Sequence, residues 1–230
     1  MKFQAILSKK RPIVICCSAG VDSVAAAHFL AKSPIFAGVP KTIFYFNHQL
    51  RHQNNLMEEA VCRLAEDLGL EFVIGRAEWE KGEKRDENTF RKKRLSFITE
   101  TFKGSQVVLA HHLDDCVESY LMNCLNGKER HLPIPIVTAS KKSNNVLIRP
   151  FMLQSKDRFR DYIKDNDLAG YVVEDESNSD ETYRRNWVRN TLVKEIDKVY
   201  PGLKKVVKKR MTDGYKALKE QLQTVEKTRS

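Results

Sequence analysis

Hydrophobic residues follow two alternating patterns along the first 150 positions of the chain. Short, continuous apolar runs of strand length are separated by segments in which apolar residues recur at helical spacing. Continuous apolar strands are typical of a sheet that is covered on both faces. The pattern therefore predicts an α/β fold, with a mainly parallel, doubly wound sheet and helices on both faces. The expected strands are 12–17, 41–47, 71–77, 105–110 and 144–150, and the expected helices between them are 21–32, 55–70, 88–102 and 114–125.

The last third of the chain has a different pattern. A helix is expected at 155–168 and a polar loop at 174–186. From Leu203 to Val225, apolar residues recur at spacings of three and four, and lysines occupy the other face. This spacing predicts a basic amphipathic helix. Such a helix could dock on the body, pair with a second copy in a homodimer, or form on RNA.

Composition is that of a soluble globular protein, but the charge is uneven. Hydrophobic residues make up 41% and charged residues 30% of the 230 positions, and no apolar run suits a signal peptide or a membrane span. We therefore expect a cytoplasmic protein without a membrane partner. Residues 1–183 carry 26 Lys+Arg against 25 Asp+Glu, whereas residues 184–230 carry 14 against 5. This asymmetry indicates a polyanionic partner, above all nucleic acid, although a solvated charged face would look the same. It also separates a main domain at 1–200 from a basic helical tail at 201–230.

The cysteines give no sign of a metal site. There are five of them, and no pair has the C-x-x-C spacing of a zinc knuckle or an iron–sulfur cluster. Two lie in an expected strand and the others in expected helices. We expect buried, reduced thiols. The five are Cys16, Cys17, Cys62, Cys116 and Cys124.

A turn of small residues, Ser-Ala-Gly-Val-Asp-Ser, links the first expected strand to the first expected helix. Such a turn presents free backbone N–H groups at the positive end of a helix dipole, where they can bind an anion. Hydroxyls could add hydrogen bonds, whereas the carboxylate would repel a phosphate unless Mg²⁺ lay between them. Alternatively, the acid or the last serine merely caps the helix. The turn consists of Ser18, Ala19, Gly20, Val21, Asp22 and Ser23.

A second polar cluster follows the fourth expected strand. Asp114, Asp115 and Glu118 open a helix there, directly after His111 and His112. Ligands of such folds bind beyond the carboxyl ends of the strands, where this cluster should meet the turn. The acids could simply favour the helix N-terminus, but with the acid of the turn they form a candidate Mg²⁺ site. The histidines are expected to orient the loop or a nucleotide, because Mg²⁺ prefers oxygen ligands.

Several motifs, in the same order, resemble one enzyme family. The turn at 18–23 resembles the S-G-G-x-D-S loop of the N-type ATP pyrophosphatases, the PP-loop superfamily with its Rossmann-like fold. Three later stretches resemble motifs of one branch, the tRNA(Ile)-lysidine synthetases. A helical segment, ENTFRKKRLSF at 87–97, matches a further family motif at several positions. The three stretches are FNHQLRH (46–52), LAHHLDDCVESYL (109–121) and VEDESNSDETYRRNWVRN (173–190), and the resemblance covers roughly 12–200.

The resemblance implies an ATP-dependent ligase that forms a carbon–nitrogen bond. In that family, ATP adenylates C2 of the wobble cytidine in the CAU anticodon of an isoleucine tRNA, and pyrophosphate leaves. The ε-amine of free L-lysine then displaces AMP, with Glu118 or Asp115 as the base. The implied cofactors are ATP and Mg²⁺, and the implied partners are the tRNA anticodon loop and lysine. The resemblance assigns catalysis to Asp22, Asp115, Glu118 and Arg189, with Mg²⁺ on Asp22 and Asp115, and it assigns nucleotide binding to the turn at 18–23 and to Asn47, His48, Arg91, Arg94, His111 and Arg185.

The chain departs from the family pattern at two places. Ala19 stands where the family has a glycine, and a positive φ there would cost about 1 kcal/mol or more. Residues 126–133 replace the family's R-G-(S/T)-G segment. Longer members carry C-terminal domains that grip the tRNA, and the tail at 201–230 could take over part of that grip. Two alternatives stay open: another PP-loop RNA-modifying enzyme, such as a tRNA thiolase, and a nucleotide- or RNA-binding module that has lost catalysis.

Overall fold

The computed structural model contains a six-stranded sheet with the order β3-β2-β1-β4-β6-β5. Neighbouring strands run parallel except at one edge, where β5 pairs antiparallel with β6. The structure describes residues 1, 3–4, 6–50, 52–128, 130, 132–140, 142–174 and 184–227, with side chains as far as 222. The strands are β1 (Ile13–Cys16), β2 (Lys41–Asn47), β3 (Glu71–Arg76), β4 (Gln106–Val108), β5 (Val137–Ala139) and β6 (Val146–Ile148).

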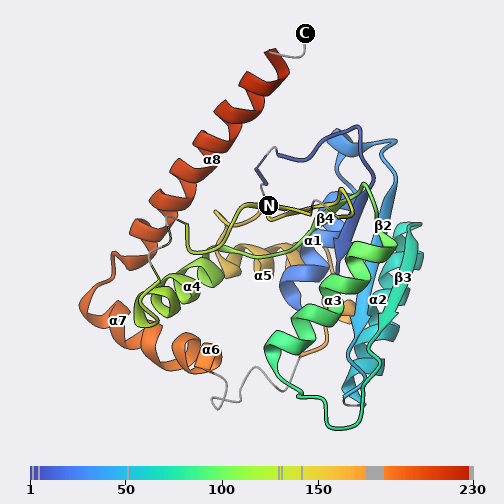
Figure 1. Ribbon diagram of the computed structural model, residues 1–230, viewed down its shortest axis with the longest axis horizontal. Helices are drawn as coiled ribbons and strands as arrows, with labels where there is room; N and C mark the ends of the chain where they lie inside the picture. The colour runs from blue at the N-terminus through green and yellow to red at the C-terminus, as the bar shows by residue number, and fades with distance from the viewer. Residues whose placement is uncertain are drawn as a thin grey trace.

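Helices fill the connections between the parallel strands and form the last third of the chain (Figure 1). The predicted α/β fold and its expected strands and helices are confirmed, apart from small shifts at their ends. The three-residue edge strand β5 was not predicted, and residues 184–186 are helical, not part of a loop. Residues 175–183 of that predicted loop lie outside the described residues. The helices are α1 (Val21–Ala31), α2 (Gln53–Leu68), α3 (Glu87–Thr101), α4 (Leu113–Leu125), α5 (Lys156–Asp165), α6 (Arg184–Trp187), a π-helical segment (Val188–Leu192), α7 (Val193–Val199) and α8 (Leu203–Lys227), with 3₁₀ turns at Pro34–Phe36 and Ala169–Tyr171.

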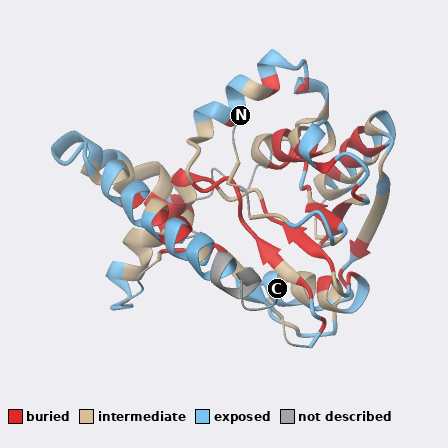
Figure 2. Ribbon diagram, turned by 90° about the horizontal axis from the view of Figure 1, so that it is seen from above, coloured by how far each residue is buried: buried red, intermediate tan, exposed pale blue. Residues whose placement is uncertain are grey.

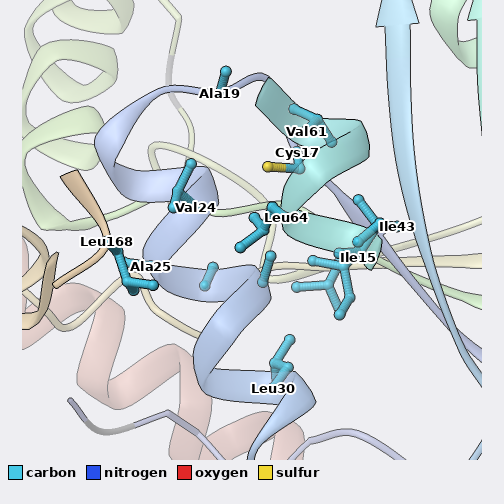
Figure 3. Packing of buried hydrophobic residues seen from close by; sticks show 14 of the residues in the cluster. Ile15, Cys17, Ala19, Val24, Ala25, Leu30, Ile43, Val61, Leu64 and Leu168 are labelled. Atoms are coloured by element: carbon cyan, nitrogen blue, oxygen red, sulfur yellow. The ribbon is translucent and has the colours of Figure 1, made fainter. Parts of the chain in front are cut away.

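The two faces of the sheet bury separate apolar clusters, because alternate strand residues point to opposite faces. Ile15 of β1 and Ile43 of β2 pack with α1, α2 and α5 on one face (Figure 3). Val14 and Phe44, their neighbours in sequence, pack against α3 on the other face. Figure 2 shows the buried residues concentrated in the strands and on the inner faces of the helices. The predicted two-sided covering of the sheet is confirmed.

Gly75 of β3 lies where the sheet packs directly against α3. A Cβ atom at this position would come within 2.6 Å of Phe46 Cδ2 and 3.0 Å of Phe97 Cδ1. We expect Gly75→Ala to lower the free energy of unfolding by about 1–3 kcal/mol, because the rings would have to leave their packed positions. Urea denaturation measures this change. In the control Gly170→Ala the added Cβ meets nothing within 4 Å, and equal unfolding free energies for the two variants would contradict the prediction.

The first half of α8 docks on the body. Val207, Met211 and Tyr215 are buried in one apolar cluster with Cys116 and Val117 of α4. Farther along, the helix extends away from the body (Figure 1). Docking, the first of the three expectations for this helix, is therefore confirmed, whereas pairing with a second copy stays a prediction. Although α8 has 25 residues, neither it nor any other helix of the described ranges is long and apolar enough to cross a membrane.

Candidate active site

A cavity of about 590 Å³ opens at the carboxyl ends of β1, β2 and β4. The strand order reverses at β1, and ligands of open α/β sheets bind at such a point. The volume is within the usual range for small-molecule sites. Of the predicted site residues, Ser18, Gly20, Asp22, Ser23, His48, Arg94, His111, Asp115, Arg185 and Arg189 line the cavity, whereas Ala19, Val21, Asn47, Arg91 and Glu118 lie outside its lining.

The turn after β1 is held by its own last serine. Ser23 Oγ accepts a hydrogen bond from the backbone N of Ser18 at 3.0 Å and donates one to the carbonyl oxygen of Gly20 at 2.9 Å. The hydroxyl proton of Ser23 therefore stays inside the turn and is not free for a phosphate. Gly20 is the N-cap of α1 and, as a glycine, has no side chain that could cap the helix. The first N–H groups of α1 are thus available to an anion.

Ala19 adopts the left-handed backbone conformation that its glycine counterpart would take freely. Its φ is +58°, and its side chain is fully buried in the cluster beneath the turn. Its carbonyl oxygen accepts a hydrogen bond from the backbone N of Val173 at 2.9 Å. The strain of about 1–2 kcal/mol for an L-residue in this region is offset in part by burial of the methyl group, worth about 0.8 kcal/mol. The turn therefore keeps its shape without the glycine.

His112 lies between the two acids that were predicted to hold Mg²⁺. Its Nε2 is 3.3 Å from Asp22 Oδ2, and its Nδ1 is 3.6 Å from Asp115 Oδ2. The backbone N of His112 donates to Asp115 Oδ2 at 2.9 Å and completes a capping box at the start of α4. Burial acts to lower the pKa of His112, but the hydrogen bond to Asp22 and the charges of Asp115 and Asp114 outweigh it and raise that pKa. Asp22 of α1 and Asp115 of α4 thus converge on one ring.

Two arginines from the segment after the undescribed residues 175–183 share one buried carboxylate. Arg189 Nε donates to Glu118 Oε1 at 2.6 Å, and Arg185 Nε donates to Glu118 Oε2 at 2.9 Å. The Nη2 atoms of Arg185 and Arg189 also lie 3.4 Å and 3.6 Å from Asp115 Oδ1. Glu118 is only 2% exposed. Glu118 holds both arginines and lies outside the lining of the cavity. These contacts therefore indicate a residue that positions the arginines, and they do not support the role of proton acceptor that the sequence suggested.

Aromatic side chains and a neutral histidine form another wall of the cavity. The ring of His48 packs 4.9 Å from that of Phe46 and 5.0 Å from that of Phe90, measured between centroids. Burial, with a smaller contribution from the charge of Arg94, lowers the pKa of His48 to about 4. The ring is therefore uncharged at neutral pH. Such a wall suits a flat, uncharged heterocycle such as a nucleobase.

Two predicted nucleotide-binding residues have other surroundings. Asn47 is buried, and its amide nitrogen donates to Glu58 Oε2 at 2.8 Å and to Asn55 Oδ1 at 3.3 Å. It fastens the end of β2 to α2 and does not line the cavity. Arg91 is exposed on α3, whereas Arg94, one turn later, lines the cavity. Of this arginine pair, only the second faces the candidate site.

Buried polar atoms without a partner gather around this cavity. Six buried side-chain nitrogen or oxygen atoms in the described part of the chain lack a hydrogen-bond partner, and four of them belong to residues that line the cavity. Since buried polar groups are normally paired, these four favour a site built for a polar ligand. The four are Asp22 Oδ1, His48 Nδ1, Arg94 Nε and His111 Nδ1.

The carboxylates fit Mg²⁺ only if the ligand supplies further oxygens. Within the described ranges, no group of three or more His, Cys, Asp or Glu side chains is arranged to hold a metal ion. Asp22 nevertheless offers an unpartnered buried oxygen, and Asp115 lies beyond the same histidine. Mg²⁺ is usually bound by one or two carboxylates together with nucleotide phosphates and water. The donor set therefore fits a magnesium–nucleotide complex better than a bare ion.

His111 makes the stability of the fold sensitive to acid. Burial lowers its pKa to about 3, although Asp115 acts in the opposite direction. In the unfolded chain a histidine titrates near 6.5, so the unfolded chain takes up the proton first as the pH falls. The neutral ring therefore contributes to the free energy of unfolding above about pH 6.5. This contribution is lost progressively at lower pH, by at most about 1.4 kcal/mol per pH unit.

We accordingly expect His111→Asn to reduce the loss of unfolding free energy between pH 6.5 and pH 4.5. Urea denaturation at several pH values measures this loss. The exposed His52→Asn serves as the matched control and should follow the wild type. If the His111 variant lost stability in parallel with the wild type, the uncharged state of His111 in the folded chain would be refuted.

Comparison with known proteins gives consistent matches. Residues 1–196 match the family model of the PP-loop domain. The tRNA(Ile)-lysidine synthase of Lactiplantibacillus plantarum is 28% identical over 208 residues, which cover 88% of this chain and 46% of that protein. The protein of the same name from Exiguobacterium sibiricum is 28% identical over 228 residues, covering 98% and 53%. The chain thus spans about half the length of the curated relatives it matches.

A solved structure shares the fold. The U34-tRNA thiolase of Methanococcus maripaludis superposes with a TM-score of 0.63 and covers 94% of this chain and 74% of its own. The sequences are 18% identical, so the likeness concerns the fold alone. It agrees with the sheet order and the covering helices described above.

Proposed function

The chain belongs to the PP-loop domain family, and from this premise we propose that it is an ATP-dependent tRNA(Ile)-lysidine synthetase. In this reaction the C2 oxygen of the wobble cytidine attacks the α-phosphorus of ATP, and the bond to pyrophosphate breaks. The ε-amine of free lysine then attacks C2 and loses a proton, and the bond from C2 to the oxygen of AMP breaks. The target is the CAU anticodon loop of an isoleucine tRNA, whose single-stranded bases can leave their stack.

One observation carries the nucleotide part of this proposal. The four unpartnered buried polar atoms surround a single cavity at the reversal point of the sheet. They come from β-strand ends and from helices α1 and α3, segments that are far apart in sequence. A ligand with many polar atoms would satisfy them together, as a nucleotide does. The uncapped start of α1 supplies the backbone N–H groups that favour phosphates at the same place.

The walls of the cavity suggest how ATP lies in it. The aromatic wall around His48 would hold the adenine, and the turn at 18–23 would hold the phosphates. Asp22 and Asp115 would hold Mg²⁺, which when bound neutralises charge on the leaving pyrophosphate. His112 contacts both carboxylates, Asp22 through Nε2 and Asp115 through Nδ1.

The charged residues divide the remaining work. Arg185 and Arg189 line the cavity and keep their orientation through Glu118, so they can bind phosphate oxygens and the charge that develops in the transition state. We assign to Asp115 the proton of the attacking amine, because it lines the cavity whereas Glu118 lies behind the arginines. Glu118 is a positioning residue in this scheme.

The cysteines argue against sulfur transfer, the alternative chemistry on this scaffold. Cys16 and Cys17 line the cavity, and burial raises their pKa to about 12 and about 11. Thiols of this kind carry almost no thiolate at neutral pH and are poor nucleophiles. The curated relatives described above, which carry the synthase name, support the same choice.

The proposal is tested by incubating the chain with ATP, Mg²⁺, labelled lysine and an isoleucine tRNA with the anticodon CAU. We expect label in the RNA, and none when the anticodon cytidine is replaced by uridine. Pyrophosphate release without label in RNA would indicate an enzyme with another substrate. Neither product would indicate a binding module without catalysis.

A further inference from the structure

A second cavity, of about 660 Å³, lies between the start of α5 and the start of α8. Its lining is basic: Arg158 comes from the first turn of α5, and Lys204, Lys205 and Lys208 come from the first two turns of α8. The remaining side chains of the described lining are uncharged and include Leu113 at the start of α4. Among the residues that the structure describes, no acidic side chain lines this cavity.

Most of this positive charge is uncompensated. Lys204 Nζ lies 2.5 Å from Asp114 Oδ1, and the same carboxylate accepts a hydrogen bond from the backbone N of Lys156 at 2.8 Å. In the described ranges, no ion pair involves Arg158, Lys205 or Lys208. Three cations that repel one another around one cavity attract a polyanion.

The second cavity and the candidate active site lie on opposite sides of the first turn of α4. Asp115 and His111 line the first cavity, and Leu113 lines the second. Asp114, between them, lies 3.7 Å from His112 Nδ1 on one side and binds Lys204 on the other. A polymer that placed one unit in the first cavity could therefore place its next charged units on the second. Figure 1 shows α4 and the start of α8 side by side.

We propose that this basic cavity, lined by Arg158, Lys204, Lys205 and Lys208, binds backbone phosphates of the RNA whose base enters the first cavity. The inference rests on the proposed function, since it needs an RNA substrate. RNA fits better than an acidic protein because a flipped base stays attached to its phosphates, and Lys204 of this cavity pairs with Asp114, the sequence neighbour of Asp115 in the first cavity. The positive excess of residues 184–230, 14 Lys+Arg against 5 Asp+Glu, extends the attraction along α8.

Deleting the tail at 201–230 would not test this cleanly. Val207, Met211 and Tyr215 are buried against the body, so a chain without α8 would expose its apolar cluster. Point variants at exposed positions avoid this problem. Lys205 and Lys208 are exposed and line the cavity, whereas Lys216 and Lys219 are exposed on the same helix with the same spacing of three and lie outside the lining.

The experiment compares two double variants of the 230-residue chain. Affinity for the CAU isoleucine tRNA is measured at several salt concentrations for the wild type, K205A/K208A and the matched control K216A/K219A. We expect K205A/K208A to weaken binding by about tenfold or more at low salt and to reduce the salt slope by about 1.4–1.8, the value for two lost phosphate contacts. K205R/K208R should restore the affinity, and thermal unfolding should be the same for all variants.

The outcomes separate this inference from the function on which it rests. If the wild type binds tRNA and both alanine pairs lose the same affinity for it, the proposed phosphate site is overturned. The basic surface would then suit an acidic protein partner. A wild type that binds no tRNA at any salt concentration would overturn the proposed function as well. If only K205A/K208A loses affinity for the tRNA, the phosphate site is supported, even if lysine is not the amine that reacts.

Discussion

Glu118→Gln is expected to lower both the stability of the protein and the pyrophosphate release that we propose for it. The carboxylate is 2% exposed and holds Arg185 and Arg189 by hydrogen bonds from their Nε atoms. The amide removes the negative charge that two half-buried guanidinium groups share. Because both arginines keep partial access to solvent, we expect a loss of unfolding free energy of about 2–4 kcal/mol, at or below the range for a fully buried pair. Activity should fall about 100-fold, since displaced arginines no longer meet the phosphates.

Pyrophosphate release and urea denaturation measure these two effects. Glu195→Gln is the matched control, because it removes the same charge from an exposed ion pair with Lys198 on α7. Exposed pairs contribute little, so this control should stay within about 0.5 kcal/mol and keep full activity. Wild-type activity in Glu118→Gln would contradict the positioning role of Glu118, because it would show that the arginines act without this anchor.

Asp22→Asn is expected to slow pyrophosphate release strongly while leaving the fold intact. The substitution keeps the shape of the side chain, and Asp22 is partly open to the cavity. Its Oδ1 atom is buried without a partner and is the oxygen best placed for Mg²⁺. Loss of a metal-binding carboxylate removes several kcal/mol of transition-state stabilisation, so a rate decrease of about 10²–10³-fold follows.

The rate is measured at increasing Mg²⁺ concentration, because a weakened metal site should be rescued in part at high concentration. Asp157→Asn, which removes an exposed carboxylate paired with Arg160 on α5, is the control and should behave as the wild type. If Asp22→Asn lowered the rate equally at every Mg²⁺ concentration, the carboxylate would act on something other than the metal.

The pattern of apolar residues was sufficient for the layers of the fold but not for its short or polar elements. Strands such as β1 and β2 are buried on both faces and leave a strong signal in the sequence. β5 has three residues with partly or fully exposed side chains, so its sequence looks like a loop. Helix α6 begins with two arginines, and Arg185 is held by Glu118 of α4. That contact is not visible in the local sequence.

The sequence predicted which residues lie together at the candidate site better than it predicted what each of them does there. Ten of the predicted residues line one cavity, but Asn47 fastens β2 to α2 and Arg91 is exposed. Both His111 and His112 were expected to orient the loop or a nucleotide, but only His111 was assigned to the nucleotide, and His112 is the one that orients the loop. The spacing from His112 to Asp115 is that of a capping box, and this signal could have shown that His112 holds the start of α4. Roles depend on side-chain partners, which motifs do not specify.

The proposed function requires the cleavage of ATP between its α- and β-phosphates in the first cavity. Incubation with ATP labelled at the α-phosphate, in the presence of Mg²⁺, lysine and the CAU tRNA, followed by separation of the products, tests this directly. We predict that the label appears in AMP in an amount equal to the pyrophosphate released, and that Asp22→Asn slows it strongly. Label in ADP, with release of inorganic phosphate, would contradict the account.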